Sequence, residues 1–138
     1  MIEDMPFEEQ FHAWLHHALA EVAIPPDVKA FAFNLLEPAA APGVKFAVEL
    51  VGTAVFDEDD PDWACDEVWT PRQRQLDIPV AFSGTGWEGC LAQVEALVRT
   101  GLASPTLGPM LQRGDAVALG FVDGDLGVLW RRPRPESD

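Results

Sequence analysis

The chain has 138 residues, 48% of them hydrophobic and 23% charged, which predicts a single domain with enough apolar side chains for a packed core. Its 23 acidic and 9 basic residues give a formal net charge of −14, a sign that disfavours nucleic acid and anionic membranes as partners. The longest apolar run, residues 116–122, is far shorter than the roughly 20 residues of a membrane helix. The first residues lack the basic stretch followed by an apolar stretch that marks a secretory signal peptide, so we expect a cytoplasmic protein.

The first half of the chain predicts one helix and two strands. Residues 7–22 form an amphipathic helix, since apolar side chains recur there at helical spacing, and the Pro25-Pro26 pair ends it. Residues 31–35 and 44–50 alternate in polarity like two half-buried strands, and the segment between them contains Pro38, Pro42 and Gly43. The two strands are therefore expected to pair antiparallel.

The second half predicts a strand, a helix and a hairpin. Residues 76–82 alternate again, with Pro79 placing this strand at an edge or a bulge. The next helix is expected to begin with a capping box between Thr85 and Glu88 and to end near Gly101. Its expected apolar stripe comprises Trp87, Cys90, Leu91, Val94, Leu97 and Val98. A short, imperfect helical turn follows Ser104-Pro105.

Two alternating runs around Asp123-Gly124 predict a hairpin with a two-residue turn. The expected facing pairs are Phe121 with Leu126, Leu119 with Val128, and Val117 with Trp130. Trp87 and Trp130 would both be core residues. The predicted architecture is an α+β domain over residues 1–130, in which a mostly antiparallel sheet of about five strands carries two helices on one face, followed by a Pro/Arg-rich tail over residues 131–138. The other face is expected to be lined by Ala30, Ala32, Ala47, Ala81, Ala118 and Gly120.

Residues 57–67, which we call the acidic segment, contain seven carboxylates in eleven positions around Trp63. Their mutual repulsion and Pro61 predict a loop. A large aromatic side chain within a charged rim is typical of protein-binding hot spots, but Trp63 could equally fold back onto the core and anchor the loop. The candidate partner-binding residues are Asp57, Glu58, Asp59, Asp60, Asp62, Trp63, Asp66 and Glu67.

The remaining motifs favour structural roles. The GTGWEG segment at residues 84–89 has the spacing of a dinucleotide fingerprint but lacks the later ribose-binding carboxylate and the repeated strand-helix-strand units. His12 and His16 are spaced to share a metal ion on a helix, yet a solvated face is the better interpretation. The acidic segment does not follow the calcium-loop pattern, and both cysteines, Cys65 and Cys90, are interpreted as structural thiols. We expect no cofactor, no metal and no catalytic residue.

The segments 62–67 (DWACDE) and 120–125 (GFVDGD) make the chain similar to small acidic bacterial immunity proteins, which are encoded beside polymorphic or contact-delivered toxins. The resemblance covers the size, the acidity and the helix-strand layout. It implies a non-enzymatic inhibitor that covers the active cleft of a toxin domain, or a surface next to it. Many such toxins are nucleases with basic substrate-binding surfaces.

Two hypotheses follow. In the first, the carboxylates of the acidic segment steer a basic protein partner, and Trp63 anchors it. In the second, a small ligand or a metal occupies a cleft between the acidic segment and the hairpin turn at Asp123 and Asp125, and the chain is a carboxylate enzyme. A convex acidic surface favours the first hypothesis, and a pocket of perturbed carboxylates the second. A monomer or weak homodimer is expected in either case.

Overall fold

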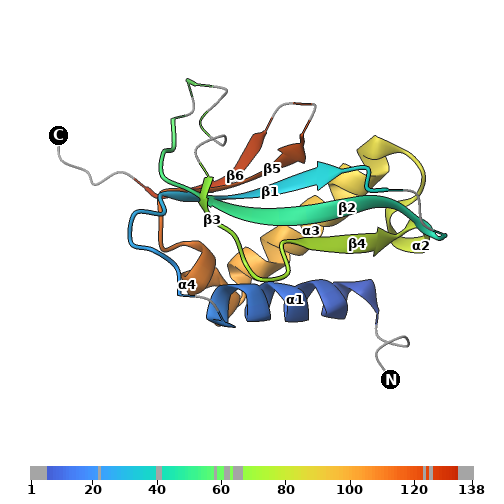
Figure 1. Cartoon of the computed structure of the whole chain (residues 1–138), viewed down its shortest axis with the longest axis horizontal. Helices are drawn as coiled ribbons and strands as arrows, with labels where there is room; N and C mark the ends of the chain where they lie inside the picture. The colour runs from blue at the N-terminus through green and yellow to red at the C-terminus, as the bar shows by residue number, and fades with distance from the viewer. Residues whose placement is uncertain are drawn as a thin grey trace.

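The structure is a computed structural model that describes residues 6–21, 23–39, 42–57, 59–60, 63, 67–122, 124 and 126–133. It has an α+β fold in which helices cover one face of a mostly antiparallel sheet (Figure 1). The elements are α1 (Phe7–Glu21), β1 (Ala30–Leu36), β2 (Val44–Thr53), β3 (Glu67–Trp69), β4 (Gln75–Pro79), α2 (Val80–Ser83), α3 (Trp87–Ala103), α4 (Leu107–Leu111), β5 (Ala116–Phe121) and β6 (Gly127–Arg131).

The sheet is built around β1 and the long strand β2. Its order is β3-β2-β1-β5-β6, and β4 pairs with β2 as well. The residues of β2 that pair with β4 lie between Val44 and Glu49, whereas β3 pairs with Gly52 and Thr53. The short strands β4 and β3 therefore pair with successive parts of the long strand β2. The pairing of β1 with β5 is parallel, and the other pairings are antiparallel.

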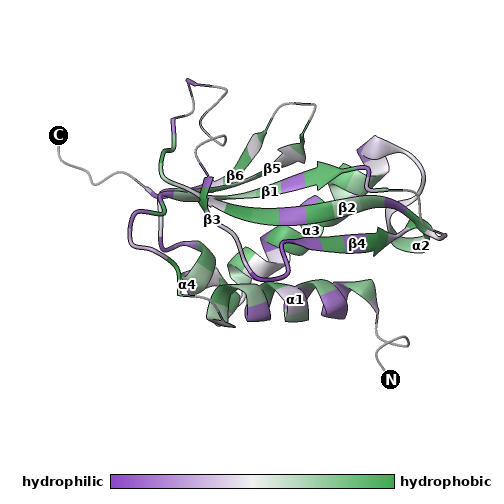
Figure 2. Ribbon diagram, in the orientation of Figure 1, coloured by the Kyte–Doolittle hydropathy of each residue, from purple (hydrophilic) through white to green (hydrophobic). Residues whose placement is uncertain are grey.

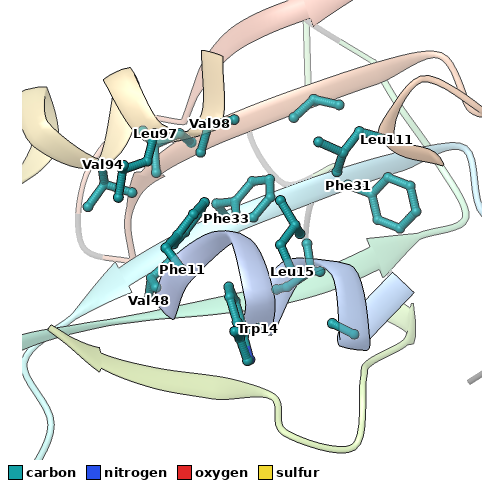
Figure 3. Packing of buried hydrophobic residues seen from close by; sticks show 14 of the residues in the cluster. Phe11, Trp14, Leu15, Phe31, Phe33, Val48, Val94, Leu97, Val98 and Leu111 are labelled. Atoms are coloured by element: carbon teal, nitrogen blue, oxygen red, sulfur yellow. The ribbon is translucent and has the colours of Figure 1, made fainter. Parts of the chain in front are cut away.

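The core lies between the sheet and the helices α1, α3 and α4. Phe11 and Leu15 of α1 point toward Phe31 and Phe33 of β1 (Figure 3). Val94, Leu97 and Val98 of α3 and Leu111 of α4 complete the same cluster. This is the arrangement that the helical and alternating apolar patterns predict, with the helices together on one side.

The central strands are largely hydrophobic on both faces, and their most hydrophilic residues are Asn34 of β1 and Lys45 and Glu49 of β2 (Figure 2). On the face away from the helices, small side chains from three strands are fully buried. We call this surface the alanine face; it contains Ala30, Ala32, Ala47, Ala116 and Ala118. Ala81 was expected there but lies in α2 instead.

The strand predicted over residues 76–82 ends early. It stops at Pro79, and Val80–Ser83 form the short helix α2. The Val80 amide donates a hydrogen bond of 2.8 Å to the carbonyl oxygen of Gly43, the residue before β2. Because β2 begins at Val44, β4 has no further β2 residue to pair with, and the chain turns into the helix α2.

The start of α3 also differs from the prediction. The cap residue is Gly86, and no side chain caps the helix, so the capping box of Thr85 and Glu88 is not formed. Cys90, Val94, Leu97 and Val98 are buried as expected, but Trp87 is 56% exposed. It is the first residue of α3 and its ring lies edge-on to Phe121 at the end of β5, so the prediction that Trp87 is a core residue is wrong.

The β5-β6 hairpin contains a bulge that the two-residue turn did not predict. Val117 faces Trp130 as expected, but Ala118 faces Val128 and Leu119 faces Gly127. The register shift moves Val128 to the alanine face, while Trp130 stays partly buried against the main core. The expected pair of Leu119 with Val128 is therefore wrong, because the bulge inserts one residue into β6 between Val128 and Trp130.

Candidate protein-binding surface

Trp63 of the acidic segment packs on the face of the sheet opposite the helices, and Glu67 belongs to β3 (Figure 1). Of the candidate residues, Asp57, Asp59, Asp60, Trp63 and Glu67 are described. Glu58, Asp62 and Asp66 lie outside the described residues, as does Cys65.

The beginning of the segment is a turn held by Asp57. The Asp57 carboxylate accepts a bond of 3.0 Å from the Asp59 amide, and the Asp57 carbonyl accepts one of 3.0 Å from the Asp60 amide. The Trp63 amide then donates to the Asp60 carbonyl at 3.2 Å. A hydrogen bond from a backbone amide to the side chain of an Asp two residues earlier defines an Asx turn. The side chains of all three aspartates are exposed.

Trp63 is turned inward, which settles the two interpretations of this residue. Only 5% of it is exposed, and it packs against Ala30, Ala116 and Ala118 on the alanine face. The ring of Phe56 meets it edge-on, with 5.0 Å between ring centroids. Trp63 is therefore the internal anchor of the acidic segment, and its predicted role as a partner-contacting residue is wrong.

The alanines explain why the indole can lie there. A tryptophan needs a flat, roomy surface, and methyl side chains on neighbouring strands supply one without competing for volume. The sequence contained this signal in the alternating alanines of β1 and β5, but linking them to Trp63 requires the strand order, which brings β1 and β5 side by side.

Glu67 forms an ion pair within the chain. Arg74 donates to the Glu67 carboxylate at 2.7 Å and to the Glu49 carboxylate at 3.1 Å. The hydrogen bonds that Arg74 donates to Glu67 and Glu49 raise the pKa of Arg74 above its ordinary value. Asn34 donates a further bond of 3.2 Å to Glu49. This network ties β1, β2 and β3 together, so Glu67 is held as part of the sheet and is less available to a partner.

The cleft of the second hypothesis cannot be placed, because Asp123 and Asp125 lie outside the described residues. Within the described ranges, no three His, Cys, Asp or Glu side chains are grouped so that they could hold a metal ion. A small hollow of about 300 Å³ lies elsewhere, beside α1, and is lined by Trp14, His17, Ala18, Arg72 and Gln73.

His12 and Cys90, which invited a chemical interpretation, are both packed against the rest of the chain. The prediction that His12 lies on a solvated face is wrong. His12 is half-buried, and its Nε2 lies 3.2 Å from the Leu97 carbonyl oxygen of α3. His16 is exposed. Cys90 is fully buried, and burial raises the pKa of its thiol to about 11, which keeps it protonated and unreactive.

The chain matches no protein-family model, no curated protein sequence and no solved structure. Among the helices in the described part of the chain, none is both long and apolar enough to cross a lipid bilayer.

Proposed function

We propose that this chain is a non-enzymatic module that binds a basic protein surface through the acidic segment, and that it acts as an immunity-type inhibitor covering a basic toxin domain such as a nuclease. The observation that carries the proposal is the pair of exposed aspartates, Asp59 and Asp60, on a turn that the buried Trp63 anchors to the sheet.

The charge balance supports a basic partner. The chain has a net charge of −14, and within the described part of the chain several basic side chains pair with acidic side chains of the same chain. They include Lys45, Arg74, Arg99 and Arg132. The acidic excess therefore faces solvent, where it raises the encounter rate with a positively charged protein.

The anchoring supports a binding role over a purely solubilising one. A tract that only keeps a protein soluble does not need a fixed conformation. Here an indole, an Asx turn and a backbone bond hold the aspartates in place, which lowers the conformational entropy that a partner would otherwise have to remove on binding. A preorganised acidic surface is suited to a specific complex.

The test is to replace Asp59 and Asp60 by Asn and to compare this variant with Glu8→Gln/Glu9→Gln, which removes the same charge from the exposed start of α1. The partner is captured from cells of the source organism at low salt, and its activity is assayed with and without the chain. Association rates are then measured across a salt series. We expect inhibition of the partner and an association rate about tenfold lower for the aspartate variant alone.

A different outcome would contradict the proposal. If both variants slow association equally, only net charge matters and the acidic segment is not the binding surface. If the captured protein keeps its full activity in the complex, the inhibitory role is wrong.

A further inference from the structure

The hollow beside α1 combines buried apolar residues with a polar rim. Its volume is about 300 Å³, near the lower end of the range of small-molecule pockets, about 300 to 1,000 Å³. Trp14 and Ala18 of α1, each 5% exposed, make up its floor. The exposed residues His17, Arg72 and Gln73 line it as well and form its rim. Small organic ligands are held by this combination of apolar surface and a few polar groups.

Hydrogen bonds fix the two walls of the hollow. The Trp14 indole N–H donates a bond of 2.8 Å to the Gln73 carbonyl oxygen, which joins α1 to the loop that leads into β4 (Figure 1). One residue later, the Arg74 carbonyl oxygen accepts a bond of 3.1 Å from the Leu50 amide of β2. The loop is thus attached both to the helix and to the sheet. A ligand would therefore enter a site whose walls are already in place, which lowers the entropic cost of binding.

The rim carries a cation that has kept its binding capacity. Within the described part of the chain, the Arg72 side chain has no ion pair, whereas Arg74, two residues later, is bonded to Glu49 and Glu67. Among the described residues that line the hollow, none is acidic. Carboxylates farther than about 8 Å away act on an anion here only weakly at physiological salt, because mobile ions screen them. The guanidinium of Arg72 is therefore available to an anion although the whole chain is acidic.

We infer that this hollow binds a small organic carboxylate with a flat apolar part, such as an aromatic acid. The planar guanidinium of Arg72 can donate two parallel hydrogen bonds to a carboxylate, and one guanidinium balances its single negative charge. The apolar part of the ligand would cover Trp14 and Ala18 and add affinity by burying its own surface. The volume suits a molecule with one ring.

The inference does not depend on the proposed function. Trp14 belongs to the core between the sheet and the helices, whereas Trp63 of the acidic segment packs on the other face of the sheet. The two sites therefore lie on different sides of the sheet and can be tested separately.

The test is an NMR titration with benzoate, in which the assigned indole N–H signals of the tryptophans are followed. Benzamide has the ring without the charge, and acetate has the charge without the ring. We expect benzoate to bind at least tenfold more tightly than either probe, because only benzoate uses both the guanidinium and the apolar floor. Benzoate should shift the Trp14 signal and leave the Trp63 signal, on the other face of the sheet, unchanged.

Variants assign the site. Arg72→Gln should weaken benzoate by about tenfold, as expected for the loss of a charge-assisted hydrogen bond. The matched control is Arg113→Gln, which removes the same charge from an exposed residue between α4 and β5 and should leave benzoate binding unchanged. Ala18→Leu fills the floor and should also weaken benzoate. Thermal unfolding verifies that each variant is folded, and Arg72→Gln decides the question if Ala18→Leu is not.

Several outcomes would overturn the inference. They are the absence of benzoate binding, equal affinities for benzoate and benzamide, and unchanged binding of benzoate to Arg72→Gln. Equal weakening by Arg72→Gln and Arg113→Gln would also contradict it, because net charge alone would then attract the anion. None of these variants alters the acidic segment, so each of these results leaves the proposed function as it stands.

Discussion

The acidic segment and the start of α3 carry the two tryptophans whose positions differ most from what their sequence surroundings indicate. Trp63 lies among carboxylates and is buried, while Trp87 lies on a helical apolar stripe and is exposed. The difference comes from the strands opposite each indole. Trp63 meets the alanines of β1 and β5, which leave room for it, whereas Trp87 lies where β5 ends and meets Phe121 edge-on. The exposure of an aromatic residue thus depends on what distant strands offer it.

Removing each indole is the largest test of this comparison. Trp63→Ala should lower the free energy of unfolding by about 3 kcal/mol, because it leaves a cavity over the alanine face. Trp87→Ala should lower it by less than about 1 kcal/mol, as expected for a largely exposed side chain. Urea denaturation measures both. Equal losses would mean that the two indoles are buried alike.

Filling the alanine face is the second test. Ala118→Leu should cost about 2 kcal/mol, because the larger side chain competes with Trp63 for volume in a packed site. The matched control is Ala96→Leu on the exposed side of α3, where the same change should be nearly neutral. Urea denaturation of both variants measures the difference. A neutral result for Ala118→Leu would show that Trp63 is not packed there.

The pH dependence of stability tests which side of α3 faces the core, because Cys90 is buried while Trp87, three residues earlier, is exposed. Burial raises the pKa of the Cys90 thiol to about 11, so the folded state keeps the proton longer than the unfolded chain, whose thiols ionise near about 8.5. The resulting stability is present in full below the unfolded pKa and is lost as pH rises through about 11. We expect the stability advantage of wild type over Cys90→Ala to shrink between about pH 8.5 and 11. A pH-independent advantage would place the thiol in solvent.

The sequence predicted the parts of the fold that depend on local periodicity. The helix α1, the strands β1 and β2, and the buried stripe of α3 from Cys90 onward are confirmed, because each follows from apolar spacing within one element. The mostly antiparallel α+β architecture followed from their order.

The errors arose where distant parts of the chain decide the outcome. The end of β4 depends on where β2 begins, and the bulge near Val128 depends on the fit of β6 to β5. Glu67 was predicted to bind a partner, and its ion pair with Arg74 was not foreseen. Arg74, Glu67 and Glu49 are brought together only by the pairing of strands in the sheet. For the candidate site, the sequence identified the acidic segment but could not assign which indole faces outward.

The smallest expected effect distinguishes a functional acidic segment from one that stabilises the fold. Asp59→Asn/Asp60→Asn should raise the free energy of unfolding by about 0.5 kcal/mol, because it relieves repulsion between exposed carboxylates that are close in sequence. Glu8→Gln/Glu9→Gln removes the same charge but should lower it by a similar amount, since acidic residues in the first turn of α1 favour the helix dipole. Both shifts are measured by urea denaturation at low salt and should shrink at high salt. Opposite signs for equal charge changes would mean that the aspartates of the acidic segment are retained at a cost in stability, as expected for binding residues. A loss of stability in both variants would instead assign the acidic segment a structural role.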